Sequence, residues 1–210
     1  MRFASVLPSF LLPMVCLTSF CAATRAEEPN VQTETIVFVR HGEKPAKDLG
    51  QLSCQGLNRA LSLPDVLIGK YGQPNFIMAP LTETKTGHLG SFSYVRPLAT
   101  IEPTAIRLGM PVNTQYSYDD IGALQAELTS STYRNSLIFV AWEHNLLDVL
   151  VKNLMQTFGG DPLSVPDWED TDFDSIFVIK LRTEGEKRTI KFEHTQEGLN
   201  GQSTDCPGKK

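Results

Sequence analysis

Two runs of β-branched and apolar residues constrain the fold of this chain more than any other feature. Residues 35–39 read TIVFV, and residues 136–142 read SLIFVAW. Apolar runs of this length are typical of strands that are buried on both faces of a sheet. The first run leads directly into Arg40-His41-Gly42-Glu43 and the second into Glu143-His144. Because parallel strands end at the same edge of a sheet, the sequence predicts both histidines at one rim.

Helix and strand signals alternate along the rest of the chain. The first expected helix is 53–61, with Ser53 as its cap, and Pro64 would end or restart it. The other expected helices are 97–108, one that Asp119 or Asp120 opens and that reaches Leu128, and 145–158. The further expected strands are 75–78, 110–113, 175–181 and 189–196, with loops at 79–94 and 159–174. This alternation predicts an α/β fold. We expect a three-layer α/β/α sandwich with a mainly parallel sheet, to which the last hairpin adds an antiparallel edge strand.

The N-terminal residues have the order of a secretory signal peptide. Arg2 precedes an apolar run over residues 6–20, and the small residues Ala22, Ala23 and Ala26 follow it. The run is shorter than the roughly 20 residues that a spanning helix needs. We therefore expect an exported protein, secreted or periplasmic and without stable membrane insertion. Its parts would be a signal peptide at 1–26, a linker at 27–34, one domain at 35–198 and a polar tail at 199–210.

Cysteine usage and charge limit the partners of this chain. Cleavage would leave Cys54 and Cys206, and in an exported protein a disulfide between them and two free thiols are both open possibilities. No spacing typical of a structural metal site occurs, so we expect neither a metal nor a cofactor. A net charge of -5 over 210 residues argues against nucleic acid as a partner. It is compatible with a small phosphorylated substrate, because a few arginines can reverse the charge of one cleft.

The residues at the expected rim suit chemistry on a phosphoryl group. His41 can attack phosphorus if one ring nitrogen is unprotonated, and the ordinary histidine pKa allows this near neutrality. Arg40 and Arg96 are permanent planar cations that pair with two phosphate oxygens at once. His144 as a cation would stabilise the charge of the group in transfer. Gly42 would let the backbone approach closely.

The motifs at these positions resemble those of the histidine phosphatase superfamily, whose fold is the phosphoglycerate-mutase-like fold. Val39-Arg40-His41-Gly42-Glu43-Lys44-Pro45 looks like the family signature of the short RHGEKP-type members, and residues 52–60, LSCQGLNRA, resemble the stretch that follows it. Tyr94-Val95-Arg96-Pro97 and Glu143-His144-Asn145 stand where the family carries its second arginine and second histidine, each in an altered context. The resemblance covers residues 35–181.

The resemblance implies a metal-independent phosphatase that acts on phosphomonoesters. His41 would form a phosphohistidine, and Arg40, Arg96 and His144 would hold the phosphoryl group. Gly42 and Arg59 are further candidates for substrate binding. The general acid that protonates the leaving group stays open among Glu143, Asp119, Asp120 and Glu43. The alternative is a module of the same fold that binds phosphate or another anion without turnover.

Overall fold

The computed structural model describes Met1 and residues 30–87 and 90–208. Its main sheet has five strands in the order β2-β5-β1-β6-β7. These strands are β1 (Val31–Arg40), β2 (Phe76–Met78), β5 (Leu137–Trp142), β6 (Ser175–Glu184) and β7 (Lys187–Gln196). Strands β2, β5 and β1 are parallel, whereas β6 is antiparallel to both β1 and β7. The expected mainly parallel sheet is thus confirmed, with the reversed strand lying one place inside the edge strand β7.

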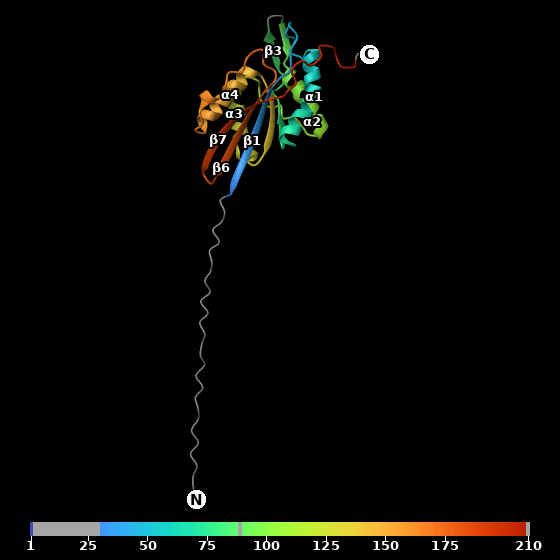
Figure 1. Ribbon diagram of the computed structural model, residues 1–210. Helices are drawn as coiled ribbons and strands as arrows, with labels where there is room; N and C mark the ends of the chain where they lie inside the picture. Colours follow the sequence, from blue (N-terminus) through green and yellow to red (C-terminus); the bar gives the residue numbers. More distant parts are fainter. Residues whose placement is uncertain (2–29, 88–89, 209–210) are drawn as a thin grey trace.

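Helices cover both faces of this sheet, which confirms the three-layer arrangement (Figure 1). Helices α1 (Cys54–Tyr71) and α2 (Arg96–Leu108) bury Leu63 and Ile101 against Val37 and Phe139. On the other face, α3 (Ile121–Leu128) and α4 (His144–Thr157) join a second core cluster. The two clusters take alternate residues of β1, as the two-residue period of a strand requires.

Several local expectations differ from the structure. Residues 31–34, expected as a linker, extend β1 because β6 is long enough to pair with them. Helix α1 continues through Pro64, which lies buried on the face that also buries Leu63 and Leu67. Residues 110–113 form no strand in the described structure beyond one bridge from Asn113 to Met78, since Pro111 has no N–H to donate.

The stretch expected as a loop at 79–94 contains a hairpin. Its strands are β3 (Thr84–Gly87) and β4 (Gly90–Ser93), and Tyr94 N–H donates to the carbonyl of Glu83 at its base. The hairpin stands above the end of the sheet where β1 finishes (Figure 1). It therefore belongs to the same rim as the histidine motifs.

The C-terminal segment, expected as a polar tail, docks on α1. Cys206 is disulfide-bonded to Cys54, and the Asn58 side chain donates to the carbonyls of Ser203 and Asp205 at 2.8 Å. Leu199 packs against the core of the α1–α2 face. Of the two open possibilities for the cysteines, the structure has the disulfide.

Residues 2–26 of the expected signal peptide lie outside the described residues. Within the described ranges, no helix is both long and apolar enough to cross a membrane.

Candidate active site

The ends of β1 and β5 bring the two histidine motifs together. Arg40 is paired with Trp142 in the parallel ladder, and His41 N–H donates to the Trp142 carbonyl at 3.0 Å. His41 and Glu143-His144 are thus neighbours across two adjacent strands. Because β6 is antiparallel to β1, its beginning reaches the same edge, and the loop before it arrives there as well.

His41 is held as a neutral imidazole. Its ring is buried, with 2% of its surface exposed, and Nδ1 lies 2.8 Å from the Gly42 carbonyl. A carbonyl only accepts, so Nδ1 carries the proton and Nε2 keeps its lone pair. Burial lowers the pKa of His41 to about 3, and the guanidinium of Arg96 acts in the same direction. The His41 ring is therefore neutral at pH 7, with a proton on Nδ1 and a lone pair on Nε2.

A close contact between two glycines places this histidine. A Cβ on Gly42 would lie 2.9 Å from the Gly56 carbonyl, and one on Gly56 would lie 2.3 Å from that of Glu43. Only residues without a Cβ let the end of β1 pass the first turn of α1 at this distance. Gly42 N–H also donates to Thr100 of α2 at 2.9 Å. The structure thus gives Gly42 a positioning role, and its expected contact with substrate stays a prediction.

Arg40 is tied to the loop before β6. Its Nη1 donates to the carbonyls of Glu169, Asp170 and Asp172 at 3.2, 2.8 and 2.8 Å. The guanidinium carbon lies 4.0 Å from the ring centroid of Phe173, in cation–π contact. Its buried Nε has no acceptor among the described residues. One N–H of this cation is therefore buried without a partner in the described part of the chain.

Arg96 enters the site at the start of α2. It is buried, contacts the Asp48 carboxylate through Nη1, and has its guanidinium carbon 4.8 Å from the Tyr94 ring centroid. Its buried Nε also lacks an acceptor in the part of the chain that the structure describes. The Tyr94 ring meets that of His41 edge-on, with centroids 6.3 Å apart. Arg96 and His41 therefore lie beside the same tyrosine.

His144 lies between two carboxylates. Its Nε2 is 2.7 Å from Asp170, and its Nδ1 is 2.9 Å from Glu143 without the geometry of a hydrogen bond. Glu143 caps α4 by accepting from Leu146 N–H. Burial would raise the pKa of Glu143, but its contacts with His144 and Leu146 outweigh burial and lower the pKa to about 2. Glu143 is therefore ionised near neutrality and poorly suited to donate a proton.

The other expected proton donors also have structural partners. Asp120 caps α3 by accepting from Ala123 N–H, and Asp119 accepts from Ser117. Glu43 accepts from Arg59 at 2.8 to 3.1 Å. In the structure these carboxylates serve as caps or ion-pair partners, as the residue types at a helix start and beside an arginine allow.

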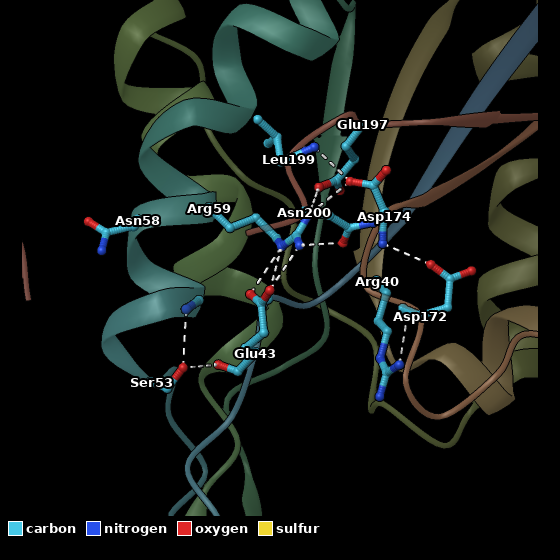
Figure 2. A network of polar contacts seen from close by, with 12 residues as sticks. Arg40, Glu43, Ser53, Asn58, Arg59, Asp172, Asp174, Glu197, Leu199 and Asn200 are labelled. Atoms are coloured by element: carbon cyan, nitrogen blue, oxygen red, sulfur yellow. Dashed lines mark hydrogen bonds and ion pairs between the residues drawn. The ribbon is translucent and has the colours of Figure 1, made fainter. Parts of the chain in front are cut away.

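Arg59 lies behind the site, in a buried ionic network (Figure 2). It is 1% exposed and reaches from α1 to Glu43 on one side and to Glu197 and Asp174 on the other, at 2.8, 2.6 and 3.4 Å. Figure 2 shows Arg40 joined to the edge of this network through Asp172, whose carbonyl accepts from Arg40 and whose carboxylate accepts from Asp174 N–H. The structure thus contradicts the expected substrate contact of Arg59, because carboxylates surround its guanidinium and leave no exposed face.

Sequence reasoning missed several residues at the rim. Asp48 contacts Arg96, and Asp170 contacts His144. Phe173 faces both Arg40 and His41. No motif carries these residues, and their loops reach the site only because of the strand order and the hairpin. The signal that could have found such residues is a position beside the end of a strand. Of the residues named here, Phe173 has that position, because it lies next to β6.

The fold and the paired histidine motifs together define a chain with the fold of the histidine phosphatases, and this confirms the resemblance at the level of the fold. The chain is similar to a structure provisionally described as the phosphohistidine phosphatase SixA of Nakamurella multipartitia. The two share a TM-score of 0.50 and 15% identity, over 80% of this chain and 98% of that chain. A structure given the same provisional description, from Agrobacterium tumefaciens, shares a TM-score of 0.50 and 9% identity, over 76% and 97%. No family model and no curated protein matches the sequence.

Proposed function

We propose that this chain is a metal-independent phosphatase that hydrolyses phosphomonoesters through a phosphohistidine on His41. The observation that carries the proposal is a buried imidazole, fixed by the Gly42 carbonyl with Nε2 unprotonated, beside Arg40, Arg96 and His144. The two arginines each have a buried N–H without an acceptor in the described residues, which suits an incoming anion. The two similar structures described as phosphohistidine phosphatases agree with this chemistry.

The reaction has two steps. Nε2 of His41 attacks phosphorus, the new P–N bond forms, and the P–O bond to the leaving group breaks. Water then attacks the phosphohistidine, the P–N bond breaks, and inorganic phosphate leaves. Arg40, Arg96 and His144 stabilise the charge on the phosphoryl oxygens in both steps. The Gly42 carbonyl keeps the proton of His41 on Nδ1, so the free lone pair is on Nε2.

Binding of the phosphoryl group displaces two carboxylates. In the structure, Asp48 pairs with Arg96 and Asp170 pairs with His144. The side chains of Asp48 and Asp170 are 44% and 88% exposed. Exposed carboxylates of this kind hold their partners weakly. A phosphate dianion is the stronger partner for Arg96 and His144, so the two acids move back toward solvent.

The leaving group decides how fast substrates react. Glu143 and Asp120 cap helices by accepting from Leu146 and Ala123 N–H, and Glu43 accepts from Arg59, so these carboxylates are already engaged as acceptors. Substrates whose leaving group is weakly basic, such as aryl phosphates, need less proton donation. We therefore expect aryl phosphates to react faster than alkyl phosphates.

The experiment is turnover of p-nitrophenyl phosphate by the mature protein, with and without EDTA, alongside His41→Ala. We expect chelator-resistant turnover that falls at least about 10³-fold in the variant. Rapid quenching at alkaline pH followed by mass spectrometry should locate a phosphoryl group on His41. Loss of turnover in EDTA would instead assign the reaction to a metal, and phosphate binding without turnover would make the chain a non-catalytic anion-binding module.

Two arginines give a matched control. Arg96→Ala removes a guanidinium beside His41 and is expected to lower kcat by about 10²-fold. Arg182→Ala removes an exposed guanidinium paired with Glu184, in the half of β6 that is remote from the rim, and should leave turnover unchanged. Equal losses in the two variants would contradict a specific role for Arg96.

We also propose that the protein is exported and takes a small phosphorylated substrate rather than nucleic acid. The Cys54–Cys206 disulfide supports export, because disulfides persist mainly in oxidising compartments. The net charge of -5 supports a small substrate. Cell fractionation with N-terminal sequencing of the mature chain tests export, and an uncleaved protein in the cytoplasm would contradict it.

A further inference from the structure

Lys85 occupies an unusual position at the mouth of the candidate site. It lies on β3 and is partly buried, with its ammonium nitrogen 4.8 Å from the ring centroid of Tyr94 and 4.3 Å from that of Tyr118. The two tyrosine rings are in contact, with centroids 5.2 Å apart. Tyr94 belongs to the segment that leads into α2, and the Tyr118 carbonyl accepts from Trp142 at the end of β5. Both rings are thus anchored to the elements that hold the site.

The Lys85 ammonium has no hydrogen-bond or ion-pair acceptor among the residues that the structure describes. Its contacts there are the two aromatic faces, which attract a cation but accept no conventional hydrogen bond. Burial lowers the pKa of Lys85, and Arg96 acts in the same direction. A partly desolvated ammonium whose three N–H groups have no acceptor among the described residues is well suited to bind an incoming anion.

The carboxylates near Lys85 have other partners. Asp48 pairs with Arg96 and lies 3.9 Å from Lys44, and Glu143 caps α4 beside His144. Lys85 therefore adds a positive charge that these acids do not compensate by direct contact. The Tyr94 ring contacts both Lys85 and His41, the proposed nucleophile, so Lys85 lies beside the same tyrosine as the proposed site.

We infer that Lys85, held by Tyr94 and Tyr118, is a specificity residue for a second anionic group on the substrate. The inference rests on the proposed function and names a substrate class within it: small phosphate monoesters that also carry a second anionic group, for which a carboxylate serves as the probe below. In the proposed function, the phosphoryl group has Arg40, Arg96 and His144 as partners. The Lys85 cation beside Tyr94 is therefore available to the remainder of the substrate.

The test uses two substrates that differ by one carboxylate, phenyl phosphate and 3-carboxyphenyl phosphate. The wild type should show the higher kcat/KM for the carboxylated substrate. Lys85→Met removes the charge at similar size and should raise KM for that substrate about tenfold, while KM for phenyl phosphate changes less than about twofold. Lys85→Arg should restore most of the preference. Lys187→Met, an exposed lysine at the start of β7, should match the wild type.

The outcomes separate this inference from the proposed function. An equal loss for both substrates in Lys85→Met, or no preference in the wild type, would overturn the inference and leave the phosphatase assignment intact. If neither substrate is turned over, the proposed function fails, and calorimetry with phenylphosphonate and 3-carboxyphenylphosphonate still tests Lys85. Tighter binding of the carboxylated phosphonate that is lost in Lys85→Met would support the inference, and equal binding would overturn it.

Discussion

At the scale of single residues, the site is organised by what each side chain contacts before any ligand binds. The Gly42 carbonyl orients His41, loop carbonyls hold Arg40, and carboxylates hold Arg96 and His144. Each contact keeps a charged or reactive group in place, and the exposed ones are weak enough to be exchanged. The buried contacts therefore hold their side chains in place before a ligand binds, whereas the exposed carboxylates can be exchanged for a ligand.

The buried His41 ring should make the stability of the protein depend on pH. Its pKa is about 3 in the folded chain, against 6.5 ordinarily, so the unfolded chain takes up a proton that the folded chain does not. The contribution of neutral, buried His41 to the free energy of unfolding is fully present above about pH 7.5 and is lost as the pH falls from there toward 3. Between pH 6 and 4, we expect the free energy of unfolding of the wild type to fall by about 1.4 kcal/mol per pH unit more than that of His41→Gln.

Urea unfolding at several pH values measures this difference directly. Parallel pH profiles for the wild type and His41→Gln would show that His41 titrates alike in the folded and unfolded chains. That result would also remove the support for an unprotonated nucleophile.

Asp170 should compete with phosphate for His144. Replacing it with Asn keeps a group of similar size and the backbone carbonyl that holds Arg40, but removes a negative charge 2.7 Å from Nε2. We expect Asp170→Asn to bind inorganic phosphate several-fold more tightly, as measured by product inhibition or calorimetry. Weaker binding in Asp170→Asn would mean that the carboxylate helps to hold the anion indirectly.

At the scale of elements, Arg59 joins parts of the chain that are far apart in sequence. It extends from α1 to Glu43 after β1, to Asp174 before β6, and to Glu197 after β7. Burial raises the pKa of Glu197 to about 8, with the charge of Arg59 opposing this. One guanidinium therefore faces three acids, and its removal would leave them buried together without a cation.

We expect Arg59→Met to lower the free energy of unfolding by about 3–5 kcal/mol, because breaking a buried ion pair leaves an uncompensated charge. The loss should be larger at pH 8 than at pH 5.5, since at the lower pH the carboxyl groups can take up a proton. Urea denaturation at the two pH values measures it. Arg182→Met removes an exposed arginine paired with Glu184 and should cost no more than about 1 kcal/mol. A loss in Arg59→Met as small as this would contradict the structural role.

At the scale of the whole molecule, the C-terminal segment closes the chain on itself. The Cys54–Cys206 disulfide spans 152 residues of sequence, and the residues before it contribute Glu197 and Asn200 to the Arg59 network. A link over so long a segment restricts the unfolded chain strongly. The tail is therefore part of the domain that positions α1 behind the nucleophile.

Reduction of this disulfide should destabilise the protein by about 2–4 kcal/mol. Guanidinium denaturation with and without dithiothreitol measures the shift of the midpoint. The double variant Cys54→Ser/Cys206→Ser should unfold at the midpoint of the reduced wild type and should not respond to dithiothreitol. Identical midpoints for the oxidised and reduced wild type would show that the contacts of Asn58 with the tail suffice to hold it.

The amino-acid sequence by itself determined the layers of the fold and the approach of the two histidine motifs. Residues 36–39 and 137–142 are apolar throughout, which is typical of buried strands, and parallel strands end at one edge whatever surrounds them. The sequence sufficed to place His41 and Gly42 because both directly follow the end of the first strand. It also placed a helix start at Asp119 or Asp120, and in the structure Asp120 is the cap.

Only the tertiary structure decided which charged groups surround those histidines. The antiparallel placement of β6 beside β1 brings Asp170 and Phe173 to the rim, and the hairpin brings Lys85. The same placement of distant segments buries Arg59 among Glu43, Asp174 and Glu197 instead of exposing it to substrate. The physical reason is that a charge is stabilised by the atoms within a few ångströms of it. For these residues, those atoms come from other segments of the chain, 26 positions away for His144 and Asp170 and as many as 138 for Arg59 and Glu197.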